Sequence, residues 1–283
     1  MTTPATAADR PAGARTGAAS PTAMGDAHAG IRFDRLAKTY AGMDGEVVAL
    51  ADASFAVAEG EFVTVLGPSG CGKSTMLLLA SGLEPPTSGS TTINGRQVTG
   101  PFTEVGIVFQ DHALLEWRSV LDNIMLQAEI RRLPRARIEE RARALLARTG
   151  LTDFANKLPF ELSGGMRQRV SICRALVHDP AFLFFDEPFG ALDALTREQM
   201  RIDLEKLWLE RRPTVLFITH SIPEAVALSD RIVVMTPRPG RIDRIITIDL
   251  PRPRDKSTVA SAKFAEYCEE ITECFMAQGV LQY

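Results

Sequence analysis

The chain has 283 residues, of which 45% are apolar and 24% charged, an ordinary balance for a globular protein with a sizeable core and one elaborated domain. A formal net charge of −3 gives no overall electrostatic reason to expect nucleic acid as a partner. The four cysteines form no Cys-x-x-Cys pair and have no histidine at zinc spacing, so they suggest neither a disulfide framework nor a metal site and fit a reducing compartment.

Residues 1–30 are dominated by Ala, Thr, Gly and Pro, lack aromatic side chains and contain no apolar signal-peptide core. We expect a disordered tail here, no secretion, and a folded region that begins near Ile31. The longest apolar runs, Met76–Ala80 and Ala181–Phe185, fall far short of the roughly 18 to 20 residues that span a bilayer.

The segment from Ile31 to Leu66 predicts short strands with a turn at Gly42–Gly45. A strand pair turning at Asn94-Gly95 follows. A buried strand over Val105–Phe109 then ends on Gln110.

The character of the chain changes between Leu114 and Leu158, where apolar residues recur at helical spacing, and we expect a helical insertion over about residues 112–163. Strands and helices then alternate, which predicts a largely parallel sheet with helices on both faces. Ser221–Glu224 is expected to form a capping box before one of these helices. The expected elements are helices over 164–178 and 196–209 and strands over 182–185, 215–219, 232–235 and 245–250.

The last part of the chain, residues 251–283, is expected to be a helical extension. Its apolar residues form one amphipathic stripe, which favours packing on the core over contact with a partner. The stripe consists of Phe264, Tyr267, Ile271, Cys274 and Phe275.

A glycine-rich segment between the apolar strand Glu61–Leu66 and a helix predicts a phosphate-binding loop. Glycines there let successive backbone N–H groups converge on phosphate oxygens. Lys73 is placed to reach the β- and γ-phosphates of a nucleotide, and the Ser74 hydroxyl to bind the Mg²⁺ between them. The candidate nucleotide-binding residues of this loop are Gly67, Pro68, Ser69, Gly70, Cys71, Gly72, Lys73, Ser74 and Thr75.

Two acidic residues follow the apolar strand Phe182–Phe185, at the strand end where ligands bind in open α/β sheets. We expect Asp186 to bind Mg²⁺ through water and Glu187 to act as the catalytic base on the water that attacks the γ-phosphate. Gln110 and His220 also follow strands. Gln110 is a candidate for contact with Mg²⁺ or the lytic water, and His220 for binding the γ-phosphate and positioning that water.

Ser163 is placed to cap a helix that begins at Gly164-Gly165, which leaves a second helix N-terminus able to bind an anion. Because the loop at Lys73 already supplies one such terminus, the second is expected to act on the nucleotide of another subunit. The prediction is a head-to-tail homodimer that encloses two ATP molecules.

These motifs together resemble the ATP-binding subunits of ABC transporters, from about Tyr40 to Ile242. The resemblance implies an α/β P-loop NTPase (RecA-like) core with an N-terminal antiparallel β subdomain and an inserted α-helical subdomain, the whole ATP-binding domain covering residues 31–250. It also implies that Tyr40 stacks on adenine, that Ser163 with Gly164 and Gly165 forms the signature loop, and that Gln110 marks the contact with membrane subunits. It further implies that Ala191–Asp193 is a D-loop, in which Asp193 links the two ATP sites, and that His220 is the switch histidine.

Finer segments resemble the nitrate/sulfonate/taurine import group, among them Val108–Leu115, Phe189–Arg197 and Pro237–Ile242. Glu116 departs from that group, which usually has proline there. The resemblance implies an ATPase that powers uptake of a small solute, such as one like nitrate, a sulfonate or taurine, or a related heterocycle. Its implied partners are two transmembrane permease subunits and, indirectly, an extracytoplasmic solute-binding protein, with the ATPase peripheral on the cytoplasmic side of the cell (inner) membrane.

Two alternatives remain. A soluble ABC-type ATPase acting on nucleic acid, ribosomes or another non-transport partner would be expected to carry tandem cassettes, a long coiled coil or a basic groove, and none is evident in the sequence. The second alternative is a scaffold that binds ATP without hydrolysing it, and the presence of Glu187 and His220 disfavours it because both are expected to serve hydrolysis.

The sequence does not indicate a GTPase. The guanine-reading Asn-Lys-x-Asp pattern is absent, because Asn156-Lys157 is followed by Leu158-Pro159. The transported substrate is not encoded in this chain.

Overall fold

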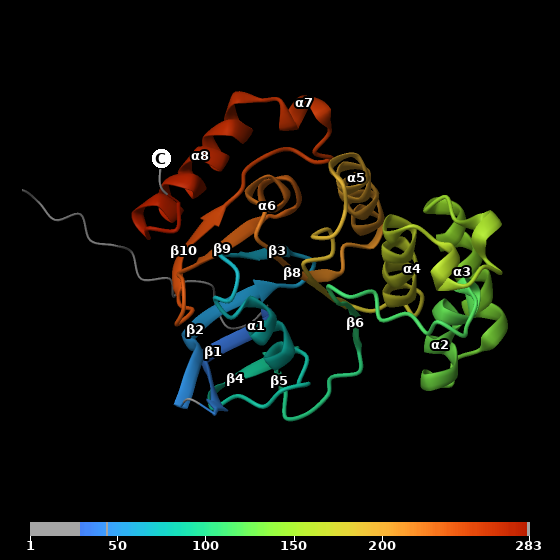
Figure 1. The fold of residues 1–283 in the computed structure, drawn as a ribbon, viewed down its shortest axis with the longest axis horizontal. Coiled ribbons are helices and arrows are strands. Elements are labelled where there is room, and N and C mark those ends of the chain that lie inside the picture. Colours follow the sequence, from blue (N-terminus) through green and yellow to red (C-terminus); the bar gives the residue numbers. More distant parts are fainter. Residues whose placement is uncertain (1–28, 44, 282–283) are drawn as a thin grey trace, which may run out of the picture.

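The structure, a computed structural model, describes residues 29–43 and 45–281, and its strands are arranged in two sheets (Figure 1). Strands β2, β1, β4 and β5 form an antiparallel sheet in that order, and β10, β9, β3, β8, β7 and β6 form the central sheet. The bounds are Ala29–Gly42 for β1, Gly45–Ala58 for β2, Phe62–Leu66 for β3, Ser88–Ile93 for β4, Arg96–Gln97 for β5, Val105–Val108 for β6, Phe182–Asp186 for β7, Thr214–Thr219 for β8, Arg231–Met235 for β9 and Ile242–Thr247 for β10.

The helices follow the order expected from the sequence. They are α1 (Lys73–Ala80), α2 (Val120–Arg131), α3 (Arg135–Arg148), α4 (Gly164–Leu176), α5 (Ala194–Arg211), α6 (Ile222–Leu228), α7 (Lys256–Val259) and α8 (Ala262–Ala277), and 3₁₀ turns lie at Thr152–Phe154 and Pro159–Glu161. Among the described residues no helix is both long and apolar enough to cross a bilayer.

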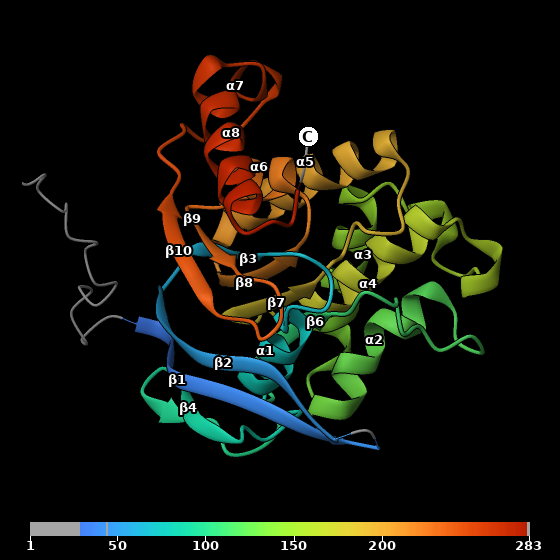
Figure 2. The same cartoon turned by 60° about the vertical axis from the view of Figure 1, so that its left-hand side comes forward.

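The central sheet is parallel from β9 to β6, and only its edge strand β10 runs antiparallel. One face packs with α1 and the antiparallel sheet, and the other packs against α4, α5, α6 and α8 (Figure 2). Strands buried on both faces need apolar side chains in succession, and β3 and β8 are buried at every residue. The expected parallel α/β core is confirmed.

The N-terminal strands are longer than expected. Ile31–Leu66 was expected to hold several short strands, but β1 and β2 each run for 14 residues. Their pairing shifts register at several points, and Arg35 (φ 45°) and Asp52 (φ 51°) adopt left-handed conformations near those shifts. Such irregularities bend a strand without ending it, so Arg35 and Asp52 are accommodated inside one continuous hairpin.

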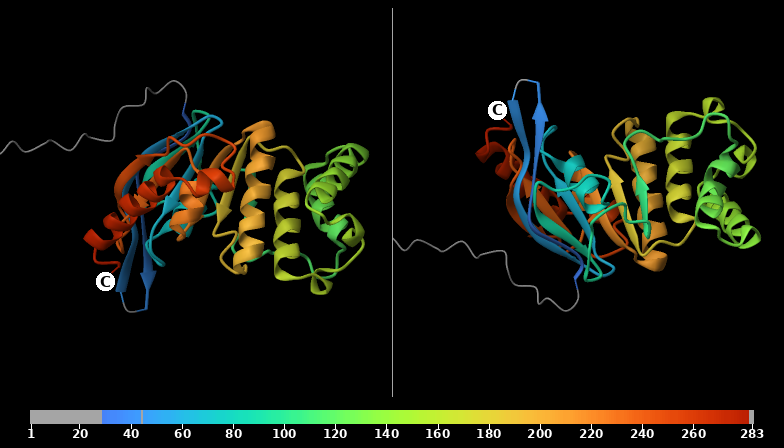
Figure 3. Two further views of the ribbon diagram at one scale, coloured as in Figure 1. Left: turned by 90° about the horizontal axis from the view of Figure 1, so that it is seen from above. Right: turned by 90° about the horizontal axis from the view of Figure 1, so that it is seen from below.

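Helices α2 and α3 lie at the end of the molecule opposite the β1–β2 hairpin (Figure 3). Their apolar residues pack with one side of α4, through Val170 and Cys173 of the helix and Val177 at its C-cap. Ile172 and Ala175, on another side of α4, pack on the central sheet. Helix α4 therefore belongs to both cores.

Three local expectations differ from the structure. The last strand was expected over 245–250, but β10 spans Ile242–Thr247 and pairs with β9. Residues 1–30 were expected to be disordered, but Ala29 and Gly30 already belong to β1; residues 1–28 lie outside the described part of the chain. The capping box at Ser221 forms only in part. Ser221 Oγ accepts from Glu224 N, but the Glu224 carboxylate accepts from Thr219 Oγ1 instead of Ser221 N.

The C-terminal extension is packed onto the core, as its apolar stripe predicted. Phe264, Ile271, Cys274 and Phe275 of α8 are buried against α6 and the central sheet. The half-buried Tyr267 accepts a hydrogen bond from Asp249 N through its hydroxyl at 3.0 Å.

A buried ionic network fastens this extension to α5. Glu205 accepts from Arg252 Nη1 at 3.1 Å and from Arg254 N at 3.0 Å. Arg254 is 1% exposed and donates to the carbonyls of Val226 and Ser229, and burial lowers the pKa of its guanidinium to about 10. A buried charge of this kind is tolerated only while its partners remain in place.

We therefore expect Glu205→Ala to lower the free energy of unfolding by about 3 kcal/mol, because it leaves Arg252 with fewer partners and Arg254 N without an acceptor. Urea titration measures the change. Asp249→Ala is the control, because it removes an exposed ion pair with Lys263 from the same segment and should change stability little. Equal effects of the two substitutions would contradict a structural role for the network.

Candidate functional site

The glycine-rich segment lies between the carboxyl end of β3 and the start of α1. Gly72 caps α1 with φ 98°, and no side chain there hydrogen-bonds to the first N–H groups of the helix. A Cβ on Gly72 would lie 2.5 Å from Ala49 O, so only glycine fits both the conformation and the space. The backbone N–H groups at this helix start are available to an anion.

A second glycine supports the loop from outside. A Cβ on Gly240, in the turn between β9 and β10, would lie 1.8 Å from Cys71 O. The neighbouring Arg238 donates from Nε to Gly70 O at 3.2 Å. The Cys71 side chain is buried in the core cluster that includes α1 and β3, and this burial raises the pKa of its thiol. No local sequence pattern predicts this support, because Gly240 and Cys71 are far apart in the chain.

The Lys73 side chain is almost fully buried. Its Nζ donates to Gly67 O and Pro68 O at 3.0 Å each and lies 3.4 Å from Glu187 Oε1. A buried ammonium needs such acceptors, and they hold the positive charge against the loop, where phosphate oxygens would be its partners.

Asp186 at the end of β7 lies against the loop. Ser74 Oγ donates to Asp186 Oδ1 at 2.9 Å, and burial raises the pKa of this carboxyl above its ordinary value. A hydroxyl and a carboxylate are hard oxygen ligands that suit Mg²⁺, which takes few protein ligands and completes its shell with water and phosphate. The described residues contain no cluster of three or more His, Cys, Asp or Glu side chains that could hold a metal by themselves. The donor set therefore fits Mg²⁺ bound together with a nucleotide.

Glu187 and His220 meet at the same sheet edge. Glu187 has φ 44°, and its N–H donates to Ile218 O of β8 at 2.9 Å. Its carboxylate lies between two positive or polar groups, with Oε1 3.4 Å from Lys73 Nζ and Oε2 3.0 Å from His220 Nδ1. The structure thus brings together Lys73, Ser74, Asp186, Glu187 and His220.

Gln110 follows β6, which is the edge strand next to β7. Its side chain is exposed, so its expected contact with Mg²⁺ or water stays a prediction.

Tyr40 lies in β1 opposite Val47, and Lys38 Nζ lies 5.0 Å from the centre of its ring. Stacking of Tyr40 on adenine likewise stays a prediction.

Ser163 and Asp193 cap the helices that follow them. Ser163 Oγ accepts from Met166 N at 3.3 Å. Asp193 Oδ1 accepts from Leu195 N and Thr196 N at 3.1 Å, and hydrogen bonds from Thr196 lower the pKa of this carboxyl. Helix α4 packs with β6, α2, α3 and α5, whereas α1 packs with β2, β4, β7 and β8. The two helix starts expected to bind phosphate, those of α1 and α4, are therefore held by different parts of the fold.

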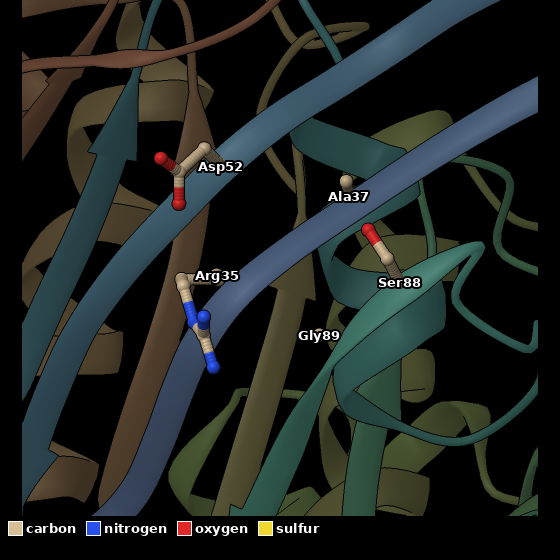
Figure 4. A pocket seen from close by; sticks show the side chains of 5 residues that line it. All are labelled: Arg35, Ala37, Asp52, Ser88 and Gly89. Atoms are coloured by element: carbon tan, nitrogen blue, oxygen red, sulfur yellow. The ribbon is translucent and has the colours of Figure 1, made fainter.

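A hollow of about 360 Å³ opens on the antiparallel sheet, where β1, β2 and β4 meet (Figure 4). It is lined by Arg35, Ala37, Asp52, Ser88 and Gly89. None of these is a predicted site residue, and the hollow is separate from the loop at Lys73.

Several known proteins are similar to this chain over most of its length. The model of the family described as ABC transporter matches residues 50–190. The taurine import ATP-binding protein TauB of Rhizobium johnstonii is 45% identical over 247 residues, which cover 85% of this chain and 94% of that protein. The nitrate import ATP-binding protein NrtD of Synechococcus elongatus is 44% identical over 233 residues, which cover 81% and 85%. An uncharacterised ABC transporter ATP-binding protein of Methanocaldococcus jannaschii is 44% identical, with 85% and 89% covered.

A solved structure has a similar fold. It is the dimeric post-hydrolysis state of the ATP-binding cassette MJ0796 bound to ADP and Pi, with a TM-score of 0.69 and 32% identity. The match covers 77% of this chain and 98% of that one.

The contact at Gly240 leads to a prediction. Gly240→Ala should push Cys71 and the loop aside and weaken ATP binding roughly tenfold or more, equivalent to the loss of about one charge-assisted hydrogen bond. Isothermal titration calorimetry measures the affinity. Gly100→Ala is the matched control, because a Cβ there meets nothing within 4 Å. Wild-type affinity in the Gly240 variant would show that this turn does not support the loop.

Proposed function

This chain belongs to the ABC transporter family of ATP-binding proteins, and from that premise we propose that it hydrolyses ATP to drive import of a small solute like nitrate, a sulfonate or taurine, or a related heterocycle. The proposed assembly is a homodimer of this chain on two transmembrane permease subunits, served by an extracytoplasmic solute-binding protein. The chain would lie peripherally on the cytoplasmic side of the cell membrane. The similarity to import subunits does not favour the alternative of a soluble ATPase with a non-transport partner.

One observation carries the catalytic part of the proposal: the Glu187 carboxylate lies within 3.4 Å of Lys73 Nζ and 3.0 Å of His220 Nδ1. Lys73 would bind the β- and γ-phosphates, and Ser74 and Asp186 would hold Mg²⁺, which when bound neutralises charge on the phosphates. Glu187 would accept a proton from the attacking water, and His220 would orient that water and the γ-phosphate. Gln110, at the neighbouring strand end, would contact the same water or the metal.

The dimer would complete each site. Gly164 opens α4, and a Cβ built there meets nothing within 4 Å, so there is open space beside this helix start. In the proposed dimer, Ser163, Gly164 and Gly165 of one copy would cover the γ-phosphate held by Lys73 of the other, and Asp193 would lie at the seam. Contacts to the γ-phosphate stabilise only the closed dimer, so hydrolysis would reopen it.

The permease contact would lie on the loop after Gln110. Buried Asn123 of α2 accepts from Leu115 N and donates to the carbonyls of Leu115, Arg118 and Ser119. Arg174 of α4 holds the carbonyls of His112 and Ala113. Trp117, on this fixed loop, is 76% exposed. A rigid loop that presents an exposed aromatic side chain suits a protein contact.

The assignment of Glu187 as the base predicts that Glu187→Gln lowers kcat at least a hundredfold, the order expected for loss of general base catalysis, and traps an ATP-bound dimer. Phosphate release and size-exclusion chromatography with ATP measure the two effects. Glu210→Gln, which changes an exposed carboxylate paired with Arg148, should leave both unchanged. Full turnover by the Glu187 variant would remove the base assignment.

The site in trans can be tested with Gly164→Asp. We expect its free energy of unfolding and the ATP affinity of the single chain to stay near wild type, because the new side chain has room and an acidic residue suits a helix start. The ATP-dependent dimer and ATP hydrolysis should be lost, because the carboxylate would meet the γ-phosphate.

Mixing this variant with Lys73→Ala provides the decisive control. If the sites form between chains, a mixed dimer holds one intact site, with Lys73 from one copy and Ser163–Gly164 from the other, and phosphate release should reappear. A mixture as inactive as its components would contradict a site shared between copies.

A further inference from the structure

The turn that presents His220 is tied to a side chain that the catalytic proposal does not use. Thr219 Oγ1 donates to Glu224 Oε2 at 2.6 Å and accepts from Ser221 N at 3.0 Å. Glu224 is 7% exposed, and burial raises the pKa of its carboxyl. The backbone on both sides of His220 is therefore held by Glu224 through Thr219.

The other oxygen of Glu224 faces α5. Glu224 Oε1 lies 3.6 Å from Arg197 Nε, and within the described part of the chain this buried Nε has no hydrogen-bond partner. The same guanidinium donates from Nη2 to Leu192 O at 2.9 Å. Arg197 thus joins Glu224 to the segment Ala191–Asp193, which ends in the cap of α5.

These contacts close a ring with the catalytic carboxylate. Leu192 N donates to Phe189 O at 3.1 Å, Gly190 N donates to Glu187 O at 3.1 Å, and Glu187 Oε2 meets His220 at 3.0 Å. The ring connects His220 through Thr219 and Glu224 to Arg197, and from there to the segment before Asp193. The 3.6 Å gap at Arg197 Nε is the one loose contact of the ring, and shortening it would give a buried charge-assisted hydrogen bond.

We propose that Glu224 and Arg197 are positioning residues that couple the turn of His220 to the segment Ala191–Asp193, and through it couple the two ATP sites. The inference rests on the proposed dimer, in which Asp193 lies at the seam between copies. Closure around one γ-phosphate moves His220, tightens the Glu224–Arg197 contact and sets the segment that the other copy meets. The two sites then bind and hydrolyse ATP cooperatively.

The test compares Arg197→Gln, Glu224→Gln and the double variant with wild type, using kcat, KM and the Hill coefficient of ATP hydrolysis. Each single variant should lower kcat roughly ten- to hundredfold, as expected for misplaced catalytic groups, and bring the Hill coefficient towards 1 with little change in KM. The double variant should be no worse than the more impaired single variant, because both remove the same link. Arg197→Lys, which keeps the positive charge facing Glu224, should retain more activity than Arg197→Gln.

Arg211→Gln is the control, because it makes the same substitution on the same helix in an exposed pair with Asp179. It should leave all three parameters unchanged. Single variants that match this control would overturn the proposal, and so would losses that add independently in the double variant.

A separate measurement distinguishes failure of the coupling from failure of the dimer. If Glu187→Gln alone forms no dimer with ATP, the proposed function fails together with the inference. If it dimerises, adding Arg197→Gln should raise the ATP concentration needed and make the dependence on ATP less steep. An unchanged ATP dependence would overturn the coupling alone.

Discussion

The site is organised by the need to keep a positive charge buried beneath the glycine-rich loop. Lys73 is 4% exposed, and its ammonium is held by two loop carbonyls and by Glu187. These contacts tie the loop after β3 to Glu187, which follows β7, and Glu187 in turn meets His220, which follows β8. Parallel strands deliver all of them to one edge, so the order β3-β8-β7-β6 is itself part of the site.

Much of this arrangement was predictable from the sequence. Continuous apolar runs such as Phe182–Phe185 identified the buried parallel strands, and the polar residues directly after them identified the site edge. The glycine loop predicted the position of Lys73 because its backbone conformation leaves few other choices. The fold, the family and the ATP-binding subunit function agree with the comparisons.

Other features depended on contacts that no local pattern contains. Strands β1 and β2 continue through residues in left-handed conformations, so they are longer than the short strands expected from the sequence. The Ser221–Glu224 spacing predicted a capping box, but buried Glu224 is drawn to Thr219 and Arg197, and the latter is distant in sequence. The support of the loop by Gly240 depends on a close backbone approach across about 170 residues, which spacing cannot reveal.

Helix α4 packs against α2 and α3 on one side and against the central sheet on another. This shared position limits how related proteins can be recombined. In a chimera that takes α2 and α3 from a related chain, α4 would have to pack well against the new helices on one side and against the original central sheet on the other. Crossover points in the loops around α2 and α3 would therefore be unsuitable, because they leave the side of α4 that faces these helices unchanged. Grafting would succeed only if Val170, Cys173 and Val177 travel with the donor helices while Ile172 and Ala175 stay with the host.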